Sequence, residues 1–97
     1  MLVRFVRMTF QADKTEEFQE IFDSSKDKIR AMRGCQYLEL MRDLNQANIY
    51  MTHSHWESAS DLNNYRDSEL FKTTWAKTKV LFAEKPLAFS VESLTVA

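Results

Sequence analysis

Two closely spaced histidines are the first candidates for a metal-binding or proton-accepting role in this sequence. His53 and His55 are two residues apart within the segment 48–57, which is rich in Ile, Tyr, Thr and Trp and alternates as a strand does. Residues at this spacing project from the same face of a strand, and two imidazoles placed in this way can hold one metal ion. An imidazole with its ordinary pKa of about 6.5 can also accept a proton from a substrate.

A metal ion would need a third ligand beside the two histidines. Glu39 lies opposite His53 only if the preceding strand pairs Met41 with Met51, and a slip of one residue would place a leucine there instead. The loop between the strands leaves both registers open, so we predict no metal site. The histidines are interpreted either as part of a subunit interface or its polar edge, or, for His55, as a proton acceptor.

Two aromatic residues with polar groups are further candidates. Trp56 ends the same segment beside a helix start, where its indole N–H can donate to a bound oxyanion or to a carbonyl of the core. Tyr65 lies on a helical face with Trp75, and its hydroxyl and ring can hold a phenolic ligand or fill the core. Both interpretations of each residue remain open.

The composition limits the class of protein. The 97 residues predict a single domain spanning 1–97, and 44% apolar with 28% charged residues are typical of a soluble globular protein. A net charge of −1 gives no general attraction to a phosphate backbone, so we expect no nucleic acid partner. Cys35 is the only cysteine, which excludes an internal disulfide and fits a reducing compartment.

The apolar N-terminal segment does not indicate secretion or membrane insertion. Residues 2–10 are mostly apolar but are interrupted by Arg4 and Arg7, unlike a signal peptide or a membrane span. We therefore expect a cytoplasmic protein with no membrane partner.

Apolar periodicity predicts four strands and two helical regions. Alternation is typical of strands over 2–10, 35–43, 48–57 and 87–96. Asp13 with Glu16 predicts a capping box at the start of the first helix, and Gly34 is placed as its left-handed C-cap.

The second helical region is predicted between Ser58 and Pro86. Ser58 with Asp61 forms another capping box, and Ser68 is expected to cap a new start after an interruption. Its apolar face is predicted to contain Leu62, Tyr65, Phe71, Trp75, Thr78 and Phe82.

The resulting order, βαββαβ, predicts an α+β ferredoxin-like fold. In this fold a four-stranded antiparallel sheet carries its helices on one face and leaves the other bare. That bare face is apolar in either phase, since it would present either Val3, Phe5, Ile49 and Met51, or Val6, Met8, Phe10, Tyr50 and Trp56. Because soluble monomers rarely expose such a patch, we predict a homodimer formed through the sheet face.

Short motifs along the chain suggest a family. They are Phe18, Gly34-Cys35, Leu38-Glu39-Leu40, Trp56-Glu57-Ser58, Tyr65, Ser68 and Phe71. With these motifs the chain resembles the antibiotic biosynthesis monooxygenase family, although Arg33 stands where many members have proline. The resemblance implies a dimeric α/β barrel and oxygenation of an electron-rich aromatic molecule without flavin, haem or metal.

The resemblance also allows individual positions to be compared. In quinone-forming members an Asn, a Trp, a Tyr and an Arg are implicated, and the corresponding positions here hold Thr52, Trp56, Leu62 and the vicinity of Phe71 or Lys72. The haem-degrading members use an Asn, a Trp and an axial His, whose positions here hold Val6, Tyr65 and Trp75. Because an indole N–H has no lone pair for iron, haem degradation is not expected.

We therefore predict a cofactor-independent monooxygenase (an oxidoreductase) that oxidises a small aromatic or quinol-like substrate with O2. The predicted catalytic residues are Trp56, Tyr65 and His55, and the predicted substrate-binding residues are Val6, Met8, Thr52, Leu62, Phe71 and Trp75. Two alternatives remain: a non-catalytic dimeric module that binds a small ligand, and a proton-transfer enzyme such as an isomerase on the same fold.

Overall fold

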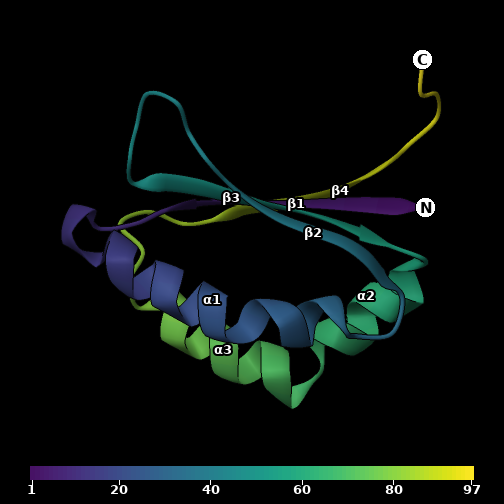
Figure 1. The fold of residues 1–97 in the computed structure, drawn as a ribbon, viewed down its shortest axis with the longest axis horizontal. Coiled ribbons are helices and arrows are strands. Elements are labelled where there is room, and N and C mark those ends of the chain that lie inside the picture. Colours follow the sequence, from purple (N-terminus) through teal and green to yellow (C-terminus); the bar gives the residue numbers. More distant parts are fainter.

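The computed structural model describes residues 1–97 and has one sheet and one layer of helices (Figure 1). A short 3-10 turn, Ala12–Lys14, precedes the first helix. The elements are β1 (Leu2–Thr9), α1 (Thr15–Arg30), β2 (Cys35–Arg42), β3 (Ile49–Trp56), α2 (Ala59–Arg66), α3 (Glu69–Lys79) and β4 (Leu87–Glu92).

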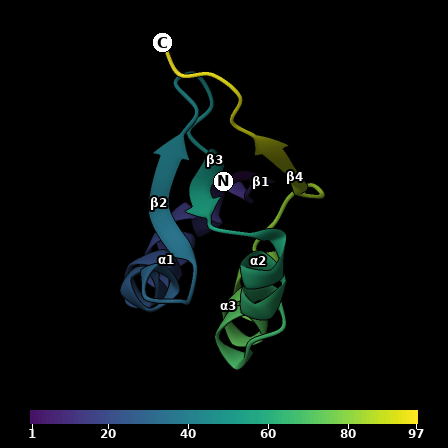
Figure 2. The ribbon, with the colours of Figure 1, turned by 90° about the vertical axis from the view of Figure 1, so that its right-hand side faces the viewer.

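The sheet confirms the predicted ferredoxin-like α+β fold. Its four strands are antiparallel in the order β2-β3-β1-β4, and all helices cover the same face (Figures 1 and 2). None of these helices is both long and apolar enough to cross a membrane.

The hairpin formed by β2 and β3 has the register that the sequence left open. Met41 pairs with Met51, which places Glu39 opposite His53. A bulge between Cys35 and Tyr37 shifts the pairing at the start of β2. The register therefore brings an acidic side chain to the histidines.

The predicted helix starts are confirmed at two positions and wrong at one. The Ser58 and Ser68 hydroxyls accept the backbone N–H of Asp61 and Phe71, each at 3.1 Å, and cap α2 and α3. Asp13 does not cap α1, because it lies within the 3-10 turn and Lys14 occupies the N-cap position without a side-chain bond.

The helical region also ends earlier than predicted. Helix α3 stops at Lys79, seven residues before Pro86, because tertiary contacts redirect the chain. Leu81 enters the core, its carbonyl accepts the Gln11 N–H at 2.9 Å, and Phe82 forms a bridge to Phe10. Phe82 is therefore not part of the helical face.

Two apolar clusters hold the helices on the sheet. One contains Met8, Phe10, Phe18, Tyr50 and Leu81, and the other contains Cys35, Trp56 and Leu62. Phe18 comes from α1 and Leu62 from α2, so each cluster joins a helix to the strands. These contacts place Met8, Tyr50 and Trp56 on the helix side and put the opposite phase, with Phe5 and Met51, on the outer face.

The outer face of the sheet is apolar and partly exposed. On β4 it presents Leu87, Phe89 and Val91, with exposed fractions of 58%, 40% and 45%. The Phe89 ring stacks on Phe5 with centroids 5.5 Å apart. No helix covers this side of the molecule (Figure 1).

Gly34 closes the corner between α1 and β2. Its φ of 82° lies in the left-handed region, as the sequence predicted, but Gly34 lies beyond the helix C-cap, which is Ala31. A Cβ at this position would also collide with the Asp61 side chain. The Gly34 carbonyl accepts the Glu57 N–H at 2.8 Å, so this corner connects β2 to the start of α2.

We expect Gly34→Ala to lower the free energy of unfolding by about 1–2 kcal/mol through the left-handed backbone alone, and by more through the contact with Asp61. Urea denaturation measures the change. The neighbouring exposed change Gln36→Ala serves as the control and should stay within about 0.5 kcal/mol of the parent. Equal midpoints for Gly34→Ala and the parent would contradict the account.

Candidate active site

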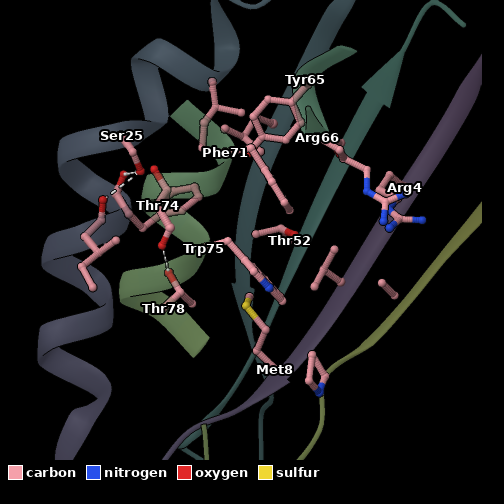
Figure 3. Close-up of a pocket in the computed structure, with 18 of the residues that line it drawn as sticks. Arg4, Met8, Ser25, Thr52, Tyr65, Arg66, Phe71, Thr74, Trp75 and Thr78 are labelled. Atoms are coloured by element: carbon pink, nitrogen blue, oxygen red, sulfur yellow. Dashed lines mark hydrogen bonds between the residues drawn. The ribbon is translucent and has the colours of Figure 1, made fainter. Parts of the chain in front are cut away.

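A cavity of about 270 Å³ lies between the helix layer and the sheet (Figure 3). It is bordered by Met8 and Phe18 of the first cluster and by Trp56 and Leu62 of the second, so it occupies the space between them. Its walls are mainly apolar and aromatic. The volume is near the lower end for small-molecule sites, about 300–1,000 Å³, and suits a small ligand.

Three helices and the sheet build these walls. Helix α1 contributes the stripe that its three- and four-residue spacing produces, α2 contributes Leu62, Tyr65 and Arg66, and α3 contributes the face that bears Phe71 and Trp75. The sheet forms the floor with alternate residues of β1 and β3, which include Val6, Met8, Thr52, Ser54 and Trp56.

The structure brings most of the predicted site residues together. The cavity is lined by Trp56 and Tyr65 and by the predicted substrate-binding residues Val6, Met8, Thr52, Leu62, Phe71 and Trp75. Phe71, Trp75, Tyr65, Thr52 and Met8 surround the same space in Figure 3. Their roles toward a ligand remain predictions.

Trp56 already uses its indole N–H within the protein. The N–H donates to the Ser54 hydroxyl at 3.0 Å, and Trp56 is only 1% exposed. Its partner is therefore a hydroxyl and not the core carbonyl considered from the sequence, while donation to a bound oxyanion stays a prediction. Because its ring stacks on Tyr65 with centroids 5.1 Å apart, Trp56 acts as a support that orients Tyr65.

The Tyr65 hydroxyl is the phenol group of the cavity and forms no hydrogen bond within the protein. Burial, with a smaller contribution from Cys35, raises the pKa of Tyr65 to about 12. The phenol therefore remains protonated at neutral pH and is available as a hydrogen-bond donor. Its ring contacts Phe71 edge-on, and Phe71 stacks on Trp75, so the aromatic wall continues along α3.

His55 lies on the other face of the sheet. It precedes Trp56 on β3, so the two side chains point to opposite sides, and His55 is absent from the cavity lining. The prediction that His55 accepts a proton from a ligand in this cavity therefore lacks the required geometry.

On the outer face His55 belongs to a hydrogen-bonded group. Its Nε2 lies 3.0 Å from Nε2 of His53, while His53 Nδ1 lies 3.5 Å from a Glu39 carboxylate oxygen that also accepts the Tyr37 hydroxyl at 2.9 Å. Desolvation and then the neighbouring His53 lower the pKa of His55. No group of three or more His, Cys, Asp and Glu side chains is arranged to hold a metal ion.

Two arginines of the cavity were missed from the sequence. Arg4 of β1 and Arg66 at the end of α2 both line it (Figure 3). Arg4 has the same strand phase as Val6 and Met8, and this phase was the signal that could have identified it. Arg66 follows Tyr65 directly, and its position depends on where the short helix α2 ends.

Comparison with known proteins identifies the family. The model of the antibiotic biosynthesis monooxygenase family matches residues 1–77. None of the curated proteins matches the chain in sequence.

Solved structures with low sequence identity share the fold. The Rv0793 protein of Mycobacterium tuberculosis is 17% identical with a TM-score of 0.90, over 99% of this chain and 97% of that one. A conserved protein of Methanosarcina mazei Go1 is 16% identical with a TM-score of 0.91, over 97% and 94% of the two chains. A structure described as an antibiotic biosynthesis monooxygenase is 12% identical with a TM-score of 0.92, over 98% and 100%. Because the family model covers most of its length, the chain belongs to the antibiotic biosynthesis monooxygenase family.

Proposed function

We propose that the cavity binds a small aromatic or quinol-like molecule and that the protein oxidises it with O2 without a cofactor. The observation that carries this proposal is an apolar cavity of about 270 Å³ whose aromatic wall presents the free Tyr65 hydroxyl. Aromatic walls favour a flat, apolar ligand, and the neutral phenol can donate to the oxygen of its ionised form. Membership of the monooxygenase family supports the reaction class.

The residues of the cavity suggest how the reaction would proceed. An anthrone or quinol that has lost a proton bears negative charge on oxygen, and the Tyr65 O–H would stabilise that charge. The carbanionic ring carbon transfers one electron to O2, and recombination forms a carbon–oxygen bond to a peroxide. For an anthrone, loss of water from the peroxide leaves a new C=O, so that one CH2 and one O2 yield one C=O and one H2O. The apolar walls exclude water from the reactive anion.

The proton that the substrate loses has no acceptor among the cavity residues. The lining contains no Asp, Glu or His, so in this scheme the substrate gives up its proton to solvent before it enters the cavity and binds as the anion. The same observation favours a second function, a binding module that holds the aromatic molecule without reacting. It also argues against a proton-transfer enzyme such as an isomerase, which needs a base beside its substrate.

Oxygen uptake with a panel of anthrones and quinols tests the catalytic proposal. We expect a rate above buffer and a loss of about 10- to 100-fold in kcat/KM for Tyr65→Phe, the range for a hydrogen bond to a charged group. Tyr50→Phe is the matched control, because the Tyr50 hydroxyl accepts from Gln19 at 3.1 Å and does not line the cavity. Ligand binding without oxygen uptake would favour the binding module instead.

We propose that the outer face of the sheet is covered by a second copy of the chain. Leu87, Phe89 and Val91 form an exposed apolar row on β4, and Tyr37 is also exposed across the sheet. Covering several hundred Å² of such surface is worth about 25 cal/mol per Å² as an upper bound. The buried free thiol of Cys35 supports a reducing, cytoplasmic location, which we also propose.

Phe89→Glu should dissociate this dimer, because burial would strip water from an unpaired carboxylate. Light scattering at micromolar concentration should give twice 11.5 kDa for the parent and 11.5 kDa for the variant. Asn64→Glu, an equal charge change on the exposed side of α2, should leave the dimer intact. A parent protein that scatters as a single chain would exclude the dimer.

The lowered pKa of His55 predicts a loss of stability in mild acid. As the pH falls through the ordinary value of about 6.5, the unfolded chain binds a proton that the folded protein resists until lower pH. The free energy of unfolding should therefore decrease from pH 7.5 to pH 5.5, and His55→Gln should flatten this dependence. Chemical denaturation at several pH values measures it, and identical slopes for the two proteins would refute the assignment.

A further inference from the structure

Two arginine side chains converge beside the otherwise apolar cavity. Arg4 is half-buried on the helix-facing side of β1, and Arg66 lies at the exposed end of α2. Both line the cavity, and Figure 3 shows them extending toward one another at the side nearest β1 and β4. Burial, and then the positive charge of Arg66, lower the pKa of Arg4, which agrees with this close approach.

Neither arginine has an acidic partner in the protein. The ion pairs within 4.0 Å involve Lys26, Arg33 and His53 and do not include Arg4 or Arg66. The hydrogen bond recorded for Arg4 runs from its Nη1 to the Ser90 hydroxyl at 3.1 Å. Since a guanidinium has five N–H donors, most of the donors of Arg4 remain free.

The side chains next to Arg4 in the sheet do not compensate its positive charge. Across the sheet Arg4 pairs with Ser54 on β3 and Ser90 on β4, both neutral. Glu92 lies two residues further along β4, opposite Leu2, and forms no ion pair with either arginine. Two like charges held close together beside an apolar space raise the electrostatic free energy, which a bound anion would lower.

Helix electrostatics explain only one of the two positions. Arg66 lies in the last turn of α2, where a positive charge complements the helix dipole. Arg4 is on a strand, and the sheet phase turns it toward the cavity with Val6 and Met8. The dipole therefore does not explain why both charges meet at the same side of the cavity.

We propose that Arg4 and Arg66 form an anion subsite and that the ligand of the cavity is a small aromatic molecule with a carboxylate group. The carboxylate would lie between the two guanidinium groups, where planar forked hydrogen bonds match its geometry. The ring would extend from there between the aromatic wall of α3 and the floor of the sheet. This inference rests on the proposed binding of an aromatic molecule, and it does not depend on the reaction with O2.

Isothermal titration calorimetry with three naphthalene probes at low salt tests this subsite. The probes are 2-naphthoate, its neutral isostere 2-naphthamide, and 2-naphthol. We expect the parent protein to bind 2-naphthoate at least about 10-fold more tightly than 2-naphthamide, as charge-assisted hydrogen bonds would produce. Added salt should reduce this preference, because Arg66 is exposed.

Three variants assign the preference to the two arginines. Arg66→Gln and Arg4→Gln should each lower the affinity for 2-naphthoate toward the affinity for 2-naphthamide. The affinity for 2-naphthamide itself should change by no more than about 2-fold. Arg42→Gln is the matched control, since Arg42 is an exposed arginine of the same sheet that does not line the cavity. Because Arg66 is exposed at a helix end, Arg66→Gln tests the subsite even if Arg4→Gln weakens the fold.

The outcomes separate this inference from the proposed function. Equal binding of 2-naphthoate and 2-naphthamide would overturn the anion subsite and leave aromatic binding standing. Preferential binding of 2-naphthol would mean that the cavity recognises a ring hydroxyl and not a carboxylate, and it would also overturn the inference. Binding of none of the probes would overturn both the subsite and the proposed aromatic site. A preference retained in both arginine variants would assign the anion to other residues.

Discussion

Adjacent residues of an extended strand point to opposite faces of a sheet, and the arrangement of this molecule depends on that alternation. On β1 the phase of Val6 and Met8 faces the helices, and the phase of Val3 and Phe5 faces outward. Both phases are apolar, but helices cover only one of them (Figure 2). The covered side contains the cavity, and the outer side is the one that we propose a second copy of the chain covers.

The same alternation explains which of the predicted site residues lie at the cavity and which do not. The fold, the hairpin and the caps of α2 and α3 followed from local periodicity and from the Ser58 and Ser68 hydroxyls. Trp56 and His55 were both assigned to one site, yet neighbours on a strand cannot share a face. Strict use of strand phase would have excluded His55 and included Arg4.

Other features could not be obtained from the sequence, because they depend on how distant segments pack. The end of α3 at Lys79 results from the contact of Phe82 with Phe10, which lies far away in the chain. The sequence is compatible with two registers of the hairpin, and the structure has the one that pairs Met41 with Met51. The cavity itself results from two clusters that join the layers at separate places and leave the space between them unfilled.

The separation of these two clusters has a consequence for how sequences that share this fold diverge. Solved structures only 12–17% identical to this chain retain TM-scores of 0.90–0.92, so the backbone persists while most side chains change. Some lining residues, such as Thr52, Phe71 and Trp75, lie outside the two clusters, so substitutions there can alter the occupant without removing the cluster contacts. A scaffold of this kind can acquire a new small-molecule preference by few substitutions, and the shared backbone alone is then a poor guide to what each member recognises.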